Sequence, residues 1–157
     1  MTDKVKLQQS TRNSRGQSGL RVQNERKIMS LIRQYNALPK AEIANLTGLS
    51  AQAVTVIIKR LETEELLIRK TPQRGRVGQP LVPFSLNSEG AFGIGLKVGR
   101  RSFDLTLIDL NGNVRATLHE NFQYPSVTKL LSFLEKGIEA LTRGLSDKLR
   151  ERILGVG

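Results

Sequence analysis

Residues 24–61 decide the fold of this chain, and they run NERKIMSLIRQYNALPKAEIANLTGLSAQAVTVIIKRL. In the first part of this stretch, apolar side chains recur at the spacing i, i+3, i+4 and i+7, at Ile28, Leu31, Ile32 and Tyr35. Four such positions form one stripe along a helix, so the pattern predicts an amphipathic helix from about Val22 to Tyr35.

Two further helices are predicted to follow, separated by a tight turn. Pro39 suits the first turn of a helix over about residues 40–47, because its missing N–H would have no partner there. Gly48 is expected to end this helix, because glycine tolerates the left-handed backbone conformation. Ser50 can cap a third helix over about residues 51–64. The apolar stripe of that third helix consists of Val54, Ile57, Ile58 and Leu61.

A β-hairpin is predicted after the third helix. Apolar segments at residues 66–68 and 81–86 flank a tip that is rich in glycine, proline and arginine, RKTPQRGRVGQP. Helix, helix, helix and hairpin is the order of a winged helix-turn-helix, which we assign to residues 20–86. Residues 1–19 are polar and basic with almost nothing to bury, and they predict a flexible arm.

A second, incomplete α/β domain is predicted over residues 91–157, after a boundary at Asn87–Gly90. Strands are expected at residues 92–98, 102–110 and 114–122, and Asn111-Gly112 is a strong hairpin signal. The remaining elements are a helix from about Val127 to Leu145 and the start of a further strand at residues 153–157. The apolar side chains expected along one buried face of that helix are Leu130, Leu131, Leu134, Ile138 and Leu141. The predicted fold class is therefore α+β, with an N-terminal winged helix-turn-helix.

The charge is concentrated in the first half of the chain. The 157 residues carry a net charge of +11, and residues 1–86 hold 15 Lys and Arg against 6 Asp and Glu. Such an excess favours a polyanionic partner, although a basic segment can also serve solubility alone. The chain has no cysteine, no apolar run of membrane-spanning length and no secretory signal, so we expect a cytoplasmic protein without disulfides, thiolate metal sites or a membrane partner.

The third helix carries the side chains expected to read duplex DNA. A major groove admits one α-helix, which needs short hydrogen-bonding groups and methyl groups on its exposed face. Gln52 can bond an adenine edge or a phosphate, and both roles stay open; Thr55 offers a hydroxyl group. The full set expected to contact DNA is Ser50, Gln52, Ala53, Thr55, Val56, Lys59 and Arg60.

In this set, Ala53 and Val56 suit thymine methyl groups, whereas Lys59 and Arg60 suit phosphates. The hairpin tip adds Arg74 and Arg76 beside Gly75 and Gly78, and arginine is favoured in the negative minor groove. The alternative to DNA binding is a three-helix fragment with a solvated polar face and a loop that contacts nothing.

The stretch from Asn24 to Leu67 resembles the N-terminal domain of ROK-family regulators (repressor, open reading frame, kinase), and most of all their sugar-responsive repressors. The tip RGRVGQP is similar to their G-R-x-G-x-P wing. MarR-type winged helices share this layout, but LNSEGAFGIGLKVGRRSFDLTLIDLNGNV resembles the opening hairpin of the ROK domain. The resemblance covers about residues 20–157 and implies a partial actin-like lobe.

The resemblance also implies a repressor of sugar-metabolism genes that binds a palindromic operator as a homodimer, with a sugar effector only where the rest of the ROK domain is present. Sugar kinase activity is a rival, but the kinase motif D-x-G-G-T is replaced here by Lys97-Val98-Gly99-Arg100-Arg101, so no catalytic residue is assigned. His119 has no cysteine partners, so neither a metal site nor a cofactor is expected. A third alternative is a truncated regulator that acts only by dimerising with a longer relative.

Overall fold

The structure is a computed structural model that describes the backbone of residues 3–72, 81–124 and 126–157, and side chains from residue 19 onward. The chain divides into two compact units, residues 1–60 with 69–85 and residues 61–68 with 86–157. The predicted boundary at Asn87–Gly90 lies just beyond the division after Ser85. The structure also groups residues 61–68, the end of the third helix and the segment after it, with the second unit, which the sequence did not predict.

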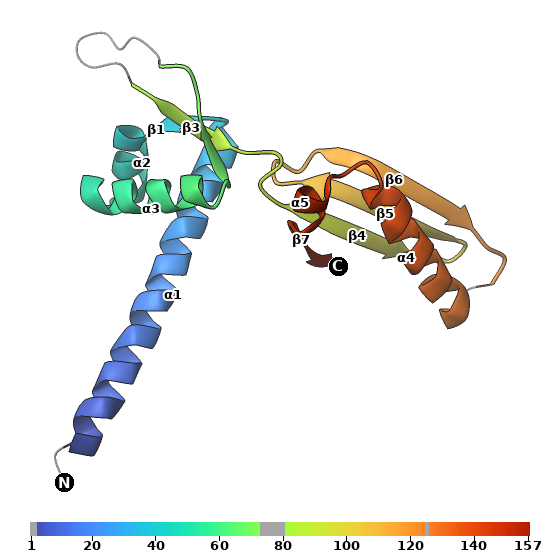
Figure 1. The fold of residues 1–157 in the computed structure, drawn as a ribbon, viewed down its shortest axis with the longest axis horizontal. Coiled ribbons are helices and arrows are strands. Elements are labelled where there is room, and N and C mark those ends of the chain that lie inside the picture. Colours follow the sequence, from blue (N-terminus) through green and yellow to red (C-terminus); the bar gives the residue numbers. More distant parts are fainter. Residues whose placement is uncertain (1–2, 73–80, 125) are drawn as a thin grey trace. The chain divides into compact units, whose positions relative to one another are not determined.

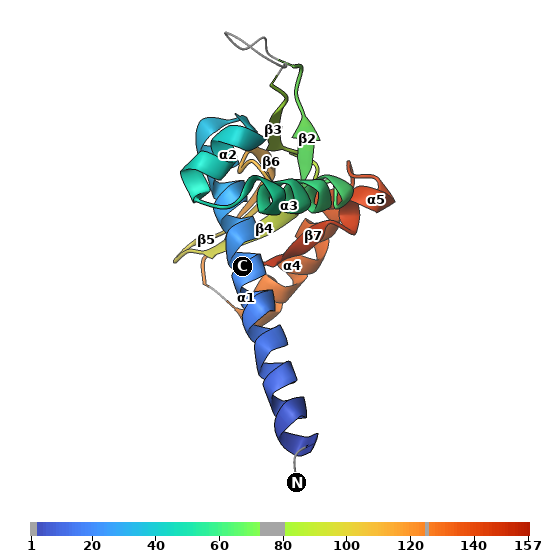
Figure 2. The same cartoon turned by 90° about the vertical axis from the view of Figure 1, so that its left-hand side faces the viewer.

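The described part of the chain up to Leu86 has the element order of a winged helix-turn-helix (Figures 1 and 2). Its helices are α1 (Asp3–Tyr35), α2 (Lys40–Thr47) and α3 (Ala51–Thr63), and its strands are β1 (Leu38–Pro39), β2 (Leu67–Arg69) and β3 (Pro83–Leu86). The strands lie in the order β1-β3-β2, and the β1–β3 pair is antiparallel, with Leu38 opposite Phe84. The fold class predicted for this part of the chain is confirmed.

The buried apolar side chains of the first unit come from every one of its helices. They are Ile28, Ile32, Leu38, Ile43, Val54, Ile57, Ile58 and Phe84. Tyr35 was predicted in this set but is 49% exposed. It is the last residue of α1, and Asn36 takes a left-handed backbone conformation with φ of 64°, so the chain turns away and Leu38 is buried instead.

Helix α1 begins much earlier than the sequence predicted. Residues 1–19 were expected to be a flexible arm, but the structure is helical from Asp3 to Tyr35 without a break. This segment contains no proline, and lysine, glutamine, arginine and leucine all have favourable helix propensities. The prediction of a flexible arm was based on the absence of apolar side chains that could be buried. Such a segment can still be helical when it extends a helix whose other end is packed in the core.

The second unit is a four-stranded sheet with a helix on one face. Its elements are β4 (Phe92–Val98), β5 (Ser102–Asp109), β6 (Val114–Asn121), α4 (Val127–Thr142), α5 (Asp147–Arg150) and β7 (Ile153–Val156). The strand order is β6-β5-β4-β7, with antiparallel pairs except for β4 and β7, which are parallel. The three predicted strands and the strand at the end of the chain are confirmed, whereas the short α5 was not predicted.

The core of this unit lies between the sheet and α4. Side chains alternate along β5, so that Phe103, Leu105 and Leu107 are buried on one face. Phe133 and Leu141 of α4 are buried with them, but Leu131, which was predicted on the buried stripe, is 54% exposed. The helix is rotated relative to the prediction, because the Phe133 ring packs 5.6 Å from that of Phe103.

A buried carboxylate organises the turn between β5 and β6. Asp109 is 5% exposed, and one of its oxygens accepts hydrogen bonds of 3.0 Å from the backbone N–H groups of Asn111 and Asn113. Its other oxygen accepts from the Asn113 amide at 3.2 Å and from Arg115 at 3.5 Å. Burial acts to raise the pKa of Asp109, but these hydrogen bonds outweigh it, and the pKa lies below its usual value of 3.8.

We predict that Asp109→Ala lowers the free energy of unfolding by about 2 kcal/mol at pH 7, because four donors lose a charged acceptor. A lowered folded pKa means that this stabilisation is complete above pH 3.8 and is lost as the pH falls through the folded pKa. Urea unfolding, followed by circular dichroism, should therefore show that the difference in free energy of unfolding between the parent and Asp109→Ala becomes smaller as the pH falls below 3.8. The control is Asp147→Ala, whose side chain is 99% exposed. Equal stability of Asp109→Ala and the parent at pH 7 would contradict the role of this turn.

Candidate nucleic-acid interface

Helices α2 and α3 form the turn that a helix-turn-helix requires. Their axes differ in direction by 118°, within the range of about 90–120° typical of this motif. Gly48 has a φ of 72° and its N–H donates to the Ala44 carbonyl at 2.9 Å, which ends α2 as predicted. The Ser50 hydroxyl accepts a hydrogen bond from the Ala53 N–H at 3.2 Å and caps α3.

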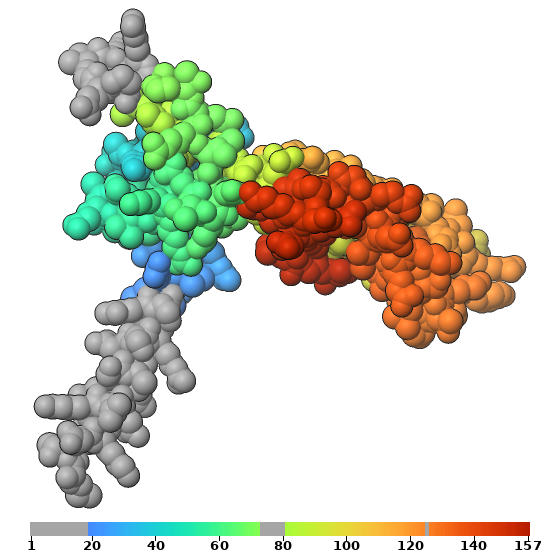
Figure 3. Space-filling model, viewed as in Figure 1, coloured from blue at the N-terminus to red at the C-terminus, as the bar shows by residue number. Residues whose placement is uncertain are grey.

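Helix α3 has one buried face and one open face. Val54, Ile57 and Ile58 are buried, as predicted, and they fix the rotation of the helix in the first unit. On the opposite side, Gln52, Thr55, Val56 and Lys59 are exposed. Val56 is 60% exposed and adds an apolar side chain to this open face. Figure 3 shows side chains of α2 and α3 (cyan and green) standing open on one face of this unit.

Arg60 differs from the other predicted contact residues. Its Nη1 donates a 2.8 Å hydrogen bond to Glu25 Oε1 of α1, and Arg21 lies 3.4 Å from the same oxygen. The Glu25 side chain is only 14% exposed, so the ion pair is partly shielded from water. In this structure Arg60 braces α3 against α1, and its predicted contact with a phosphate stays a prediction. Spacing along α3 could not show this, because the partner lies 35 residues earlier in the chain.

The base of the wing carries two cations that the sequence analysis missed. The Lys40 Nζ and the Arg69 Cζ lie 5.5 and 5.9 Å from the centroid of the buried Phe84 ring. Pro39 and Leu81 join these three residues around a shallow hollow of about 380 Å³. The signal in the sequence was a basic residue at the start of α2 and a basic pair, Arg69-Lys70, just before the tip.

The predicted wing residues Arg74, Gly75, Arg76 and Gly78 lie outside the residues that the structure describes, so their role stays a prediction. The strands that flank them are present, and the Lys70 N–H donates to the Pro83 carbonyl at 2.8 Å. This bond continues the β2–β3 pairing beyond Arg69.

Neither a metal centre nor a membrane span is found in the described parts of the chain. No group of three His, Cys, Asp or Glu side chains there is arranged to hold a metal ion. No single described helix is long and apolar enough to cross a membrane, and only α2 and α3 taken together as a bent pair pass a test of length and composition.

His119 is engaged on the surface of the sheet. Its Nδ1 lies 2.6 Å from Asp104 Oδ1 and its Nε2 lies 3.1 Å from Asn121 Oδ1. The hydrogen bond with Asp104, followed by that with Asn121, raises the pKa of His119 above 6.5. In the turn where kinases carry a phosphate loop, the Gly99 N–H donates to the Ser102 carbonyl at 2.8 Å. This amide is therefore engaged within the hairpin.

Comparison with known proteins agrees with this geometry. Residues 22–68 match the family described as winged helix-turn-helix DNA-binding. The chain is 28% identical over 134 residues to the DNA-binding transcriptional dual regulator NagC of Escherichia coli K12, covering 83% of this chain and 32% of NagC. It is 22% identical to the uncharacterized protein y4fQ of Sinorhizobium fredii, covering 85% of this chain and 34% of that protein.

A solved structure shares the fold. The crystal structure of a ROK family transcriptional regulator, a homologue of the E. coli MLC protein, superimposes with a TM-score of 0.62 and 20% sequence identity. The match covers 87% of this chain and 34% of the solved one. The chain thus spans about a third of the length of the proteins it matches, and it shares the fold of the matched third of the solved structure.

We predict that Arg60 and Glu25 are energetically coupled. Arg60→Ala and Glu25→Ala should each lower the free energy of unfolding, and the double variant should lose less than the sum of the two. A coupling of about 0.5–1 kcal/mol is expected for a pair that is only partly shielded from solvent. Urea titrations of the four proteins measure it, with Lys59→Ala as the control at the adjacent exposed position. Fully additive losses would show that the ion pair does not brace α3.

Proposed function

We propose that this chain, which is related in sequence and fold to the ROK-family transcriptional regulators, binds duplex DNA in a sequence-specific manner through α3. The observation that carries the proposal is the exposed face of that helix. Gln52, Thr55 and Val56 offer an amide, a hydroxyl group and an apolar side chain on a helix whose other side is buried. These are the groups that distinguish base pairs in a major groove.

Each exposed residue has its own proposed role. Gln52 reads an adenine edge, Thr55 donates to or accepts from a base, and Val56 contacts a thymine methyl group. Lys59, one turn beyond Thr55, binds a phosphate and fixes register without reading sequence. Ser50 keeps its hydroxyl for the cap of α3, so its proposed contribution is to hold the first turn of the helix in place. Ala53 is half-buried and contributes little reading surface.

Cations beside the helix supply the affinity that does not depend on sequence. Lys40 and Arg69 lie at the base of the wing, and the predicted tip arginines Arg74 and Arg76 follow Arg69 within seven residues of the sequence. Contact between these side chains and phosphates would release counterions from DNA. The stacking of both cations on Phe84 limits their motion, which lowers the entropy lost on binding.

The regulatory role follows from the relatives and extends beyond the part of them that this chain spans. We infer a cytoplasmic repressor of sugar-metabolism genes that binds a palindromic operator as a homodimer, since a two-fold protein matches a two-fold site. The sugar effector is proposed only for a chain that includes the remainder of the ROK domain. Kinase activity is not proposed, because matched relatives with a described function are transcriptional regulators.

We predict that Gln52→Ala relaxes sequence preference. Binding sites selected by the parent protein from a random duplex library should bind the variant with a loss of about 1–3 kcal/mol, because one bidentate base contact is removed. Binding to unrelated DNA should change little. Fluorescence anisotropy with both duplexes measures the two losses. An equal loss on both would make Gln52 a backbone contact.

We further predict that Lys40→Ala with Arg69→Ala lowers affinity for all duplexes alike. The slope of log K against log salt should become shallower by about two, one for each phosphate contact removed. Lys97→Ala with Arg100→Ala, two basic residues of the second unit, is the matched control. A salt titration that gives the parent slope for the Lys40 and Arg69 variant would exclude the wing base from the interface.

A further inference from the structure

The second unit has an edge strand with an open hydrogen-bonding side. Strand β6 is the last strand of the sheet order β6-β5-β4-β7, so among the described strands it pairs with β5 alone. Six of its eight residues are exposed and none is buried. Backbone N–H and C=O groups therefore alternate along its free side, which makes β6 a template for another strand.

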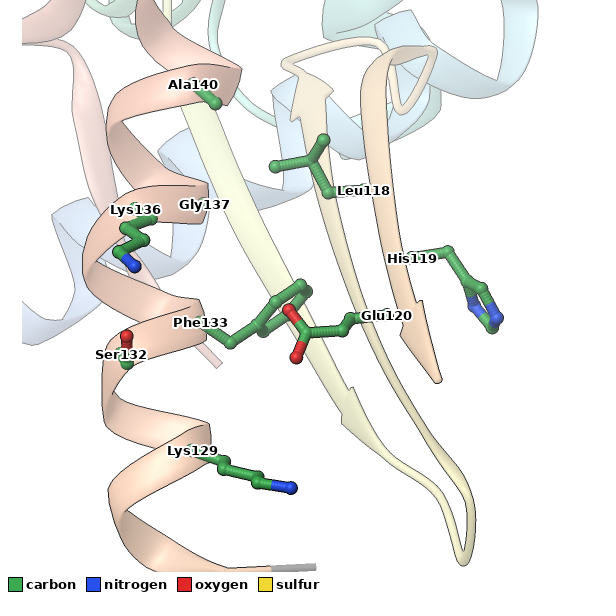
Figure 4. Close-up of a pocket in the computed structure, with 9 residues that line it drawn as sticks. All are labelled: Leu118, His119, Glu120, Lys129, Ser132, Phe133, Lys136, Gly137 and Ala140. Carbon is green, nitrogen blue, oxygen red and sulfur yellow. The ribbon is translucent and has the colours of Figure 1, made fainter. Parts of the chain in front are cut away.

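A groove runs beside this edge, between β6 and α4 (Figure 4). Its volume is about 430 Å³, and its apolar surface is made by Leu118 of β6 and by Phe133, Gly137 and Ala140 of α4. The helix lies close to the sheet at Gly137, where a Cβ atom would come within 2.9 Å of the Leu105 side chain. The groove is thus a depression over a packed floor.

Basic side chains line the helical side of the groove. Lys129 and Lys136 are exposed, and neither has an ion-pair partner within the described part of the chain. They are seven residues apart on α4, about 10.5 Å along the helix axis, which equals the length of three residues in an extended strand. Figure 4 shows Glu120 pointing toward α4, whereas His119 points away from it. The two lysines outnumber this one carboxylate, so the groove favours an acidic ligand.

We propose that the groove between β6 and α4 binds an extended acidic segment of a partner protein, which adds a fifth strand beside β6. The backbone of that segment would pair with the open edge of β6, and its alternate apolar side chains would enter the groove over Leu118 and Phe133. Flanking carboxylates would meet Lys129 and Lys136. This site lies in the second unit and is independent of DNA binding by α3.

The probe is a fluorescein-labelled peptide with the sequence Glu-Leu-Glu-Val-Glu-Leu-Glu, titrated with the full 157-residue chain and followed by anisotropy. Three changes should each raise the Kd of the peptide about tenfold, which corresponds to a loss of about 1.4 kcal/mol of binding free energy. The first is methylation of alternate peptide amides, which removes strand pairing. The second is Lys129→Glu with Lys136→Glu. The third is Ala140→Phe, which fills the groove from an exposed position.

The controls separate this site from general attraction to a chain of net charge +11. Arg100→Glu with Arg101→Glu reverses as much charge in the turn after β4 and should leave the affinity within about twofold. A peptide of the same residues in block order should bind about tenfold more weakly. In amide exchange measured by NMR, only the strand-forming peptide should protect β6.

Two results would overturn the proposal. One is equal binding of the alternating, block-order and methylated peptides, which would show attraction to net charge alone. The other is a parent protein that sediments as a dimer and does not bind the peptide, together with a Lys129→Glu and Lys136→Glu variant that sediments as a monomer. That result would assign the groove to a second copy of the chain. Circular dichroism and thermal unfolding of each variant confirm that it is folded, since every substituted residue is exposed.

Discussion

Burial of one stripe of α3 is the constraint on which the proposed DNA interface depends. Val54, Ile57 and Ile58 are at most 8% exposed, and each buried aliphatic side chain contributes roughly 1.5–3 kcal/mol. That burial leaves the helix one possible rotation, so Gln52, Thr55 and Val56 must face solvent. The cap at Ser50 and the ion pair between Arg60 and Glu25 then hold its two ends. The exposed face proposed to read DNA is thus a consequence of how the core is packed.

The two units present surfaces of different chemistry. The first unit exposes a convex helix face with cations beside it, which suits the wide, negatively charged groove of a duplex. The second unit exposes a strand edge and an apolar groove with two lysines on its rim, which suits an extended chain. A duplex cannot pair with β6, and a single strand of peptide gains little on α3. Partners of the two proposed sites therefore need not compete.

Apolar periodicity predicts that a segment forms a helix or strand, but it does not show which other elements pack against that segment. Some side chains on the predicted stripes are therefore exposed. Tyr35 lies on the predicted stripe of α1 and yet is exposed, because the helix ends there and Leu38 of β1 takes up the core position. Leu131 is exposed while Phe133 is buried, because aromatic packing with Phe103 sets the rotation of α4. The pairing of β1 with β3 links residues more than forty positions apart.

The sequence by itself determined the order of helices α1 to α4 and of strands β2 to β7, the glycine that ends α2, the serine that caps α3, and the hairpin turn after Asp109. Those features depend on the local spacing of apolar residues and on the backbone preferences of single residues, and both can be read from the order of residues in the sequence. Only the tertiary structure decided that Arg60 faces Glu25, that Lys40 and Arg69 meet over Phe84, and that a groove lies beside β6. Each of these depends on residues distant in the chain, and no local pattern records which of them fold together.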